Sequence, residues 1–387
     1  MMLTRKELEK QEYKLLAPYA MKSKETRGRV HKEKEHNYRS VYQRDKDRII
    51  YSTAFRRLEY KTQVFVNHEG DHYRTRLTHT LEVSQLARTI ARTLKLNEDL
   101  AEAIALAHDL GHTPFGHSGE TALHKLMQGH GDFEHNRQGL RIVDILEKRY
   151  PNFNGLNLTW EIREGIIKHT TTYDKADQAE LAKFNSDKPA TLEAQTVDMA
   201  DEIAYNNHDL DDGLRSGLIK NNDLMKLELW KRFYSKFKQI HPGLSDQQQR
   251  YQTVRALINY QVTDLIEETA RKINKLNIDS ISKVKQLSKK IVQFSPEVSK
   301  EKKRLKTFLN EKLYQHYRVT RMSGKAQRFI RKLFEVYLDK PEQLPPQSQA
   351  RLKKDGPHRV ICDYIAGMTD RYALNEYKKL FEPFEQV

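Results

Sequence analysis

The feature that most constrains the fold is a run of small and aliphatic residues, 100–107, that ends in the adjacent pair His108 and Asp109. An almost uninterrupted Ala, Leu and Ile helix has no broad polar face, so it has to be buried among other elements. Burying a carboxylate is costly unless a cation or strong hydrogen bonds compensate its charge. The segment therefore predicts a buried helix that delivers a metal-binding pair into the interior of the protein.

Further ligands are expected from helices on either side of this pair. His79 lies upstream in RLTHTLEV, and an acidic helix downstream contains Asp201, Tyr205 and Asp209. Asp201, Tyr205 and Asp209 stand at i, i+4 and i+8 and so share one helix face. Two acids on one face would repel each other if they were merely solvated. Two histidines and two carboxylates suit Mn²⁺, Fe²⁺, Mg²⁺ or Zn²⁺, with positions left open for water and substrate. We therefore expect a catalytic metal site.

More ionisable side chains cluster immediately after the pair. His112 is one turn further on, His117 and Glu120 follow a Pro-Phe-Gly turn, and His135 begins the next predicted helix. Glu120 is three residues from His117, which is close enough to orient its ring for proton transfer. A lone histidine in a helix is more often packed or solvated than functional. This density within 108–135 is not explained by a chance surface distribution.

Hydrophobic periodicity predicts an all-α protein, since no strand pattern persists beyond a few residues. An amphipathic segment spans 45–63, and helices are predicted at about 77–95, 97–109, 119–129, 134–149, 159–170 and 190–208. Long helices are expected from 213 to about 340, a turn at 341–349 and a last helical part from 360. Loops are expected at 66–76 and 174–189.

Three regions follow from this pattern. Residues 1–45 form a polar N-terminal extension with few core positions, and 46–220 form the catalytic helical core. Residues 221–387 form a C-terminal helical region that we expect to complete the substrate site and to carry subunit contacts.

Composition places the chain among folded, soluble proteins. Hydrophobic residues make up 37% and charged residues 31% of its 387 positions. That mixture is typical of a helix-rich globular protein and not of a disordered one. No stretch approaches the ~18 apolar residues of a membrane span, and the N-terminus lacks the apolar core of a signal peptide. The single cysteine, Cys362, excludes an intrachain disulfide and a thiolate zinc site, so we expect a cytoplasmic protein without a membrane.

The net charge of +15 indicates an anionic partner or a solvated basic surface. Nucleic acid and a polyphosphate nucleotide are the two candidate partners. The solvated surface is the favoured explanation for one helical run without interleaved aromatic residues. That run contains Lys300, Lys302, Lys303, Arg304 and Lys306.

Seven sequence blocks together resemble a known family, the HD-superfamily deoxynucleoside triphosphate (dNTP) triphosphohydrolases, in particular the bacterial dGTPase-like branch. The blocks run in the family's order from about residue 27 to near the C-terminus. They are QRDKDRIIYSTAFRRLEYKTQVF (43–65), RLTHTLEV (76–83), HDLGHTPFGHSGE (108–120), FEHNRQGLRI (133–142), TWEIREGIIKH (159–169), ADEIAYNNHDLDDGL (200–214) and DYIAGMTDRYA (363–373).

The resemblance implies an HD-domain helical bundle with an additional C-terminal helical region. It implies a divalent metal held by His79, His108, Asp109 and Asp201. It also implies hydrolysis of a dNTP at the α-phosphorus, which yields a deoxynucleoside and intact triphosphate.

The resemblance assigns the remaining candidate residues to the substrate. His117 is implied as the catalytic histidine that protonates the departing 5′-oxygen, with Glu120 as its partner. His112 and His135 resemble the family's further phosphate-side histidines.

The substrate-binding side is implied in the same way. Gln63 resembles the residue that reads the 3′-hydroxyl, and Arg76 resembles the arginine placed against the phosphates. Tyr205 and Asp209 resemble the wall that excludes a ribose 2′-hydroxyl. One position departs from the pattern of some animal relatives, because Glu202 stands where they carry a phosphate-reaching lysine. The resemblance further implies a symmetric homo-oligomer, and it leaves allosteric activation by dNTPs open.

Two other functions remain in competition at this point. One is a different HD phosphohydrolase, acting on nucleoside monophosphates or cyclic nucleotides, which would share the metal residues but would have no use for His117, Gln63 or Tyr205. The other is a nucleic-acid-binding protein with a secondary HD site, which the net charge of +15 motivates. Nucleic-acid binding does not exclude the triphosphohydrolase function, since single-stranded nucleic acid is a possible partner of a dGTPase relative. The preferred base is not specified by the sequence.

Overall fold

The computed structural model describes residues 2–63, 74–170, 182–184 and 188–386. Over these ranges the protein consists of helices, and the only β pairing is in isolated bridges such as Thr62 with Thr75. The prediction of an all-α fold is therefore confirmed. Within the same ranges no helix is both long enough and apolar enough to traverse a bilayer.

The N-terminal region contributes more to the core than the sequence suggested. Helix α1 spans Arg5–Leu15 and α2 spans Val41–Ile50. Ala20 and Tyr42 are fully buried in the main hydrophobic cluster. The expectation of few core positions before residue 45 is too low, because five apolar side chains of this region pack in the same cluster as the central helices: Ala17, Ala20, Met21, Val41 and Tyr42. Helix α2 also begins before residue 45, where a capping box on Ser40 fixes its start.

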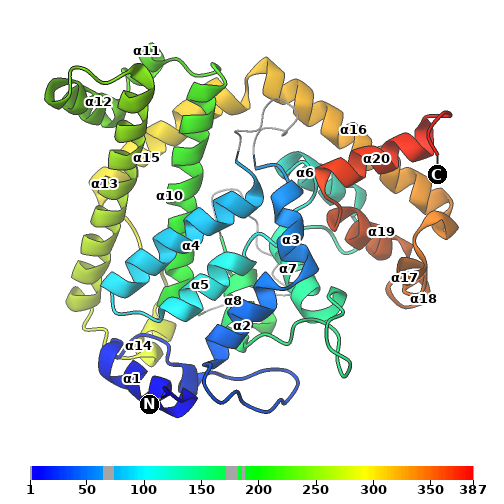
Figure 1. Cartoon of the computed structure of the whole chain (residues 1–387), viewed down its shortest axis with the longest axis horizontal. Coiled ribbons are helices and arrows are strands. Elements are labelled where there is room, and N and C mark those ends of the chain that lie inside the picture. Colours follow the sequence, from blue (N-terminus) through cyan, green and yellow to red (C-terminus); the bar gives the residue numbers. More distant parts are fainter. Residues whose placement is uncertain (1, 64–73, 171–181, 185–187, 387) are drawn as a thin grey trace.

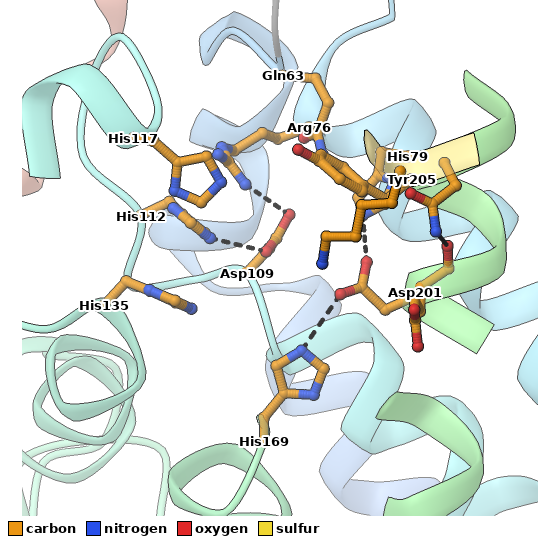
Figure 2. Close-up of a pocket in the computed structure, with 13 residues that line it drawn as sticks. Gln63, Arg76, His79, Asp109, His112, His117, His135, His169, Asp201 and Tyr205 are labelled. Carbon is orange, nitrogen blue, oxygen red and sulfur yellow. Dashed lines mark hydrogen bonds and ion pairs between the residues drawn. The ribbon is translucent and has the colours of Figure 1, made fainter. Parts of the chain in front are cut away.

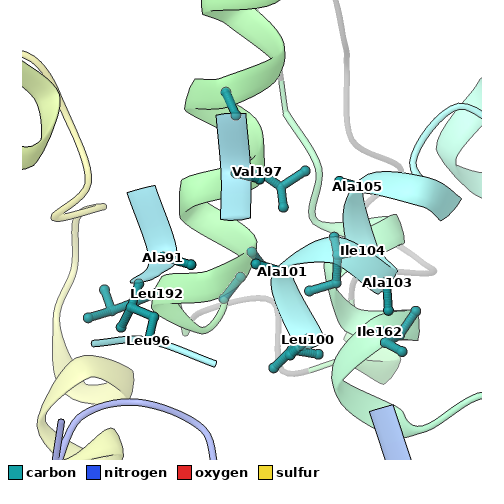
Figure 3. Close-up of a cluster of buried hydrophobic side chains, with 14 of the residues drawn as sticks. Ala91, Leu96, Leu100, Ala101, Ala103, Ile104, Ala105, Ile162, Leu192 and Val197 are labelled. Atoms are coloured by element: carbon teal, nitrogen blue, oxygen red, sulfur yellow. The ribbon is translucent and has the colours of Figure 1, made fainter. Parts of the chain in front are cut away.

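Four helices form the centre of the molecule: α4 (Arg76–Thr93), α5 (Glu98–Ala107), α8 (Trp160–Ile167) and α10 (Leu192–Arg215). Figure 3 shows how Leu100 and Ile104 of α5 meet residues of the neighbouring helices, among them Ile162 and Val197. The buried helix predicted before His108 is therefore present. It ends at Ala107, so His108 follows its last turn.

A second hydrophobic cluster links the segment after His108 to the C-terminal region. Helix α6 (His117–Leu126) packs on α16 (Tyr317–Asp339), and Figure 1 shows α19 (Pro357–Ala366) and α20 (Asp370–Phe381) on the same side. Phe115, just before α6, is buried in this cluster. The loop between His108 and α6, which carries His112, therefore packs against the C-terminal region through Phe115.

The remaining helices complete the bundle. The segment predicted as one helix over 134–149 is α7 (His135–Arg141) followed by a π-helical turn (Ile142–Leu146). Helices α11 (Asn221–Leu224), α12 (Glu228–Ile240), α13 (Asp246–Lys275), α14 (Ile281–Gln286) and α15 (Pro296–Leu309) follow α10. The predicted turn at 341–349 contains two very short helices, Pro341–Gln343 and Pro346–Gln349, and α18 (Leu352–Asp355) follows.

Two sequence expectations concern segments that the structure only partly describes. The predicted loops at 66–76 and 174–189 lie largely outside the described residues. The region boundaries at 45/46 and 220/221 stay a prediction.

Candidate active site

Most of the candidate residues meet around one cavity, shown in Figure 2. Its lining includes Gln63, Arg76, His79, Asp109, His112, His117, His135, Asp201 and Tyr205. His108, Glu120 and Asp209 are not part of the lining. Four residues that were not singled out as site residues also line it: His169, Glu202, Asn206 and Lys306.

Four side chains from three parts of the chain converge on one side of the cavity. The Nε2 atom of His79 lies 2.9 Å from Oδ1 of Asp201. The Nε2 atom of His108 lies 3.3 Å from Oδ1 of Asp109 and 3.8 Å from Oδ1 of Asp201. All four residues are buried. Local helices set this geometry, since α4, α10 and the end of α5 each supply a ligand atom from a packed backbone.

His108 shows that this group is suited to a metal ion. Its Nδ1 atom is 2.6 Å from the carbonyl oxygen of Ala105, so Nδ1 carries the proton and donates it there. Nε2 therefore presents a lone pair, and it is buried without a hydrogen-bond partner among the described residues. Burial lowers the pKa of His108 and keeps the ring neutral. A neutral imidazole with an orphaned acceptor beside two carboxylates is the donor set that a divalent cation takes.

The two carboxylates remain ionised, as metal ligands must. Burial alone would raise the pKa of Asp109, but its interactions with His108, Arg76 and His112 outweigh burial and hold that pKa well below the ordinary value. Burial also opposes ionisation of Asp201, and hydrogen bonds from His169 and His79 overcome it.

His169 is the clearest omission of the sequence analysis. Its Nε2 atom is 3.4 Å from Oδ2 of Asp201, and its Nδ1 atom is 2.7 Å from Oδ1 of Asp198. Lys290 in turn reaches Oδ2 of Asp198 at 2.5 Å. A local signal existed, because His169 follows the end of α8 much as His108 follows α5.

Arg76 contacts a metal-ligand candidate directly. Its Nη1 atom donates to Oδ2 of Asp109 at 2.9 Å, and the side chain is buried. The guanidinium therefore orients this carboxylate while it also lines the cavity.

The opposite side of the cavity is a cluster of three histidines and one glutamate. The rings of His112 and His135 stack with centroids 4.0 Å apart, and Nε2 of His112 is 3.2 Å from Oδ1 of Asp109. Glu120 accepts hydrogen bonds from the backbone N–H and Nδ1 of His135, at 3.1 and 2.9 Å. His117 Nδ1 lies 3.4 Å from the other oxygen of Glu120. Glu120 therefore lies behind both rings.

These groups differ in protonation. Burial, together with the charges of Arg76 and His135, lowers the pKa of His112 well below the usual range, so this ring is neutral. Burial opposes ionisation of Glu120, but the charge of His135 and hydrogen bonds from His117 and His135 hold the pKa of this carboxyl well below its ordinary value. The His117 side chain is 48% exposed, which leaves its ring accessible from the cavity.

The predicted substrate residues separate into two groups. The Oε1 atom of Gln63 is buried without a hydrogen-bond partner in the part of the chain that the structure describes, and Tyr205 also faces the cavity. Asp209 is buried away from the lining and accepts a hydrogen bond from the hydroxyl of Tyr314. Asp209 lies on the same face of α10 as Asp201, as predicted. The cavity, however, extends along this face only as far as Tyr205 and Asn206.

Comparisons with known proteins agree with this geometry. The HD domain model matches residues 76–206, and the phosphohydrolase-associated domain model matches residues 292–379. A deoxyguanosinetriphosphate triphosphohydrolase-like protein of Geobacter metallireducens is 51% identical over 97% of this chain and 98% of its own length. A protein of the same description from Ralstonia pickettii is 53% identical over 95% and 94%. The chain belongs to the deoxyguanosinetriphosphate triphosphohydrolase-like family.

The two matched regions of this HD family member both reach the cavity. The first region contains all four metal-ligand candidates and the histidine cluster. The second contains Lys306, which lines the cavity, and Lys302, whose Nζ is 3.4 Å from Glu202.

Lys302 corrects the expectation of a solvated basic run. Its side chain is buried, its Nζ lies 3.6 Å from the ring centroid of Phe294, and burial lowers its pKa to about 8. Lys302 and Lys306 are four residues apart and therefore share the face of α15 that meets α10.

Proposed function

We propose that this protein hydrolyses deoxynucleoside triphosphates at the α-phosphorus in a metal-dependent reaction, releasing a deoxynucleoside and intact triphosphate. One observation carries the proposal. The carboxylates of Asp109 and Asp201 line the same cavity as the histidine cluster, and Nε2 of His108, which has no hydrogen-bond partner among the described residues, lies directly behind them. A phosphate held between these two sides would meet ligand atoms on one side and proton donors on the other.

The metal would be held by His79, His108, Asp109 and Asp201. When bound, a divalent cation supplies Lewis-acid polarisation of a phosphate oxygen and lowers the pKa of water. The residues around it prepare this site. Arg76 fixes the carboxylate of Asp109 by a 2.9 Å hydrogen bond, and His169 fixes Asp201. Such outer contacts hold ligand atoms in place before the ion arrives.

Proton transfer to the leaving group is assigned to His117. Its Nδ1 faces Glu120, and we assign to its Nε2 the protonation of the departing 5′-oxygen. Glu120, which lies beside this Nδ1, orients the ring. His112 and His135, stacked beside it, provide polar contacts to the phosphates.

The sugar is assigned to the other end of the cavity. The side-chain carbonyl oxygen of Gln63, which has no hydrogen-bond partner among the described residues, is assigned to accept a hydrogen bond from the 3′-hydroxyl. The Tyr205 ring forms the wall that would leave no room for a ribose 2′-hydroxyl. Lys306 adds a cation toward the triphosphate, the function that Glu202 cannot supply.

We also propose a further partner, a cellular location, an oligomeric state and a metal ion. The net charge of +15 supports single-stranded nucleic acid as a further partner, and the sole cysteine supports a cytoplasmic location. A symmetric homo-oligomer, allosteric action of dNTPs, and Mn²⁺ or Mg²⁺ as the ion are proposed from the family alone.

Product analysis tests the proposed reaction. The protein is incubated with each of the four dNTPs, singly and mixed, in Mn²⁺ or Mg²⁺, and the phosphate products are separated. We expect triphosphate and deoxynucleoside, and no triphosphate from His108→Ala. His130→Ala is the matched control, because this exposed histidine stacks on His358 outside the cavity. Release of only pyrophosphate or orthophosphate would contradict the proposal.

A further inference from the structure

A buried carboxylate of the C-terminal region is bonded to the loop that carries the catalytic histidines. Asp370, the first residue of α20, accepts a hydrogen bond from the backbone N–H of Phe115 at 2.8 Å. Its other oxygen accepts from the backbone N–H of Thr62 at 3.0 Å and from the Thr62 hydroxyl. One side chain therefore joins two segments, and it contacts neither the cavity nor a metal-ligand candidate.

Lys61, next to Thr62 in the chain, makes a second connection between this loop and the C-terminal region. Lys61 is buried, and its Nζ donates to the carbonyl oxygen of His112 at 2.5 Å and to that of Ala366 at 2.9 Å. Lys61 and Asp370 thus hold the loop at both ends, one at His112 and the other at Phe115.

The loop needs such support because its backbone is strained. Phe115 adopts φ +62°, a left-handed conformation that a bulky residue rarely takes. Gly116 follows at φ +57°, and a Cβ there would lie 3.3 Å from Nη2 of Arg76. This sharp turn separates His112 from His117, so its shape decides where the two rings lie relative to each other.

The C-terminal region supplies the forces that hold the turn. The Phe115 ring is buried in the second hydrophobic cluster, 6.4 Å between centroids from Phe329. The only polar side chain that bonds the Phe115 N–H in the described structure is Asp370. Without that acceptor the Phe115 N–H would be buried and unsatisfied. The hydrogen bond that stabilises the left-handed conformation of Phe115 would then be lost.

We propose that Asp370 is a positioning residue of the hydrolytic reaction, which acts through the Phe115 turn to set His112 and His117 against the metal side of the cavity. The inference rests on the proposed function. It assigns to the phosphohydrolase-associated region a task in catalysis that is separate from substrate contact, and it makes the active site incomplete without residues near the C-terminus.

The first test measures the turn itself and needs no activity. Hydrogen–deuterium exchange is followed by mass spectrometry in peptides that cover 110–118, in the full-length wild type and in Asp370→Asn. Asparagine keeps the size of the side chain, but its amide group turns N–H donors toward the donors of Thr62 or Phe115. We expect exchange of these peptides to rise at least about tenfold in the variant.

Asp363→Asn is the matched control. Asp363 is equally buried, lies on the adjacent α19 and accepts hydrogen bonds from Arg141 and Arg351, not from the loop. It should leave exchange of 110–118 as in the wild type. An equal rise in both variants, or none in Asp370→Asn, would overturn the inference.

The second test asks whether Asp370 acts through His117. Displacing a catalytic group by about 1 Å can lower a rate by roughly 100-fold, so Asp370→Asn should lower kcat by about 10- to 100-fold. Mn²⁺ affinity should change by less than about twofold, because no metal-ligand candidate contacts Asp370. In a His117→Ala background the same substitution should lower kcat by less than about threefold, because the ring that it positions is gone.

A general loss of folding would give a different pattern. It would weaken Mn²⁺ affinity along with kcat, and it would lower kcat equally in both backgrounds, which would contradict the inference. If Asp370→Asn does not fold, Thr62→Val removes only one donor to Asp370 and should shift exchange and kcat in the same direction by a smaller factor. An inactive wild type would instead overturn the proposed function, while the exchange measurement would still decide whether Asp370 holds the turn.

Discussion

The two sides of the cavity are built in different ways. The metal side consists of side chains projecting from α4, α10 and the end of α5, all packed on one hydrophobic cluster. The histidine side consists of a strained turn and the start of α6, both supported by the separate C-terminal cluster, together with His135 at the start of α7, which packs on α8. His79 is 1% exposed, whereas the His117 side chain is 48% exposed.

This difference separates two requirements of a hydrolytic site. Metal affinity depends on ligand atoms that are held rigidly before the ion binds, and closely packed helices provide that. Proton transfer depends on how the proton-donating group is placed against the substrate. Here that placement is set by contacts from a separate cluster, such as Phe115 with Asp370, which lie 255 residues apart.

The largest effect is expected from the metal side. Asp201→Ala removes a proposed metal ligand together with the acceptor of His79 and His169, so the remaining buried groups lose their common partner. Triphosphate release should fall by at least about 1,000-fold, because water is no longer activated. Isothermal titration with Mn²⁺ should show no saturable binding at the site. Retained tight binding would show that the two sides are not divided as described.

The histidine side should respond with loss of turnover alone. His117→Ala should lower kcat by about 100-fold or more, the usual contribution of a general acid. Glu120→Gln should do so less strongly, since it leaves the ring in place but removes the charge behind it. Mn²⁺ titration of both variants should match the wild type. If Mn²⁺ affinity fell together with kcat, the two sides of the cavity would not act separately, which would contradict the comparison.

Core substitutions should distinguish the supporting clusters. Leu100→Ala under the metal side and Ile330→Ala in the C-terminal cluster each remove a fully buried side chain. Each should lower the free energy of unfolding by about 2–5 kcal/mol in urea titrations. Under conditions where both proteins stay folded, Leu100→Ala should weaken Mn²⁺ binding, and Ile330→Ala should lower kcat only. If Leu100→Ala lowered only kcat and Ile330→Ala weakened Mn²⁺ binding, the two clusters would not support the two sides of the cavity as described.

The smallest effect is expected in how the free energy of unfolding depends on pH, through Asp209 of α10. Burial raises the pKa of Asp209 to about 7, above the ordinary value of 3.8, whereas Asp201 on the same helix is shifted downward. Between about pH 4 and 7 the folded protein therefore holds a proton at Asp209 that the unfolded chain has lost, so this group's contribution to stability declines as pH rises. Asp209→Asn should flatten that decline in urea titrations from pH 5 to 8. An unchanged slope would show that Asp209 is not the group responsible.

The sequence was sufficient wherever a role depends on local pattern. The Ala-rich run before His108, the acidic helix with Asp201 and the spacing of His117 and Glu120 each placed their residues correctly in the cavity or beside it. Helical periodicity fixes which side chains share a face, and a buried apolar helix must lead its polar end into the interior.

Local pattern was insufficient where partners are distant in the chain. His169, Lys306 and Asp370 become recognisable only from their contacts with α10, the cavity and the Phe115 turn. Asp209 shows the converse, since its helix face was clear but the extent of the cavity was not.

The sequence by itself determined the helical class through its periodicity, and it indicated the family and the four candidate metal ligands through seven blocks that resemble that family. Only the tertiary structure decided which buried charges face one another, that Lys302 is buried rather than solvated, and that the C-terminal region holds the histidine turn. The physical reason is that burial and hydrogen bonding across separate clusters are properties of packed surfaces, and no spacing along one helix encodes them.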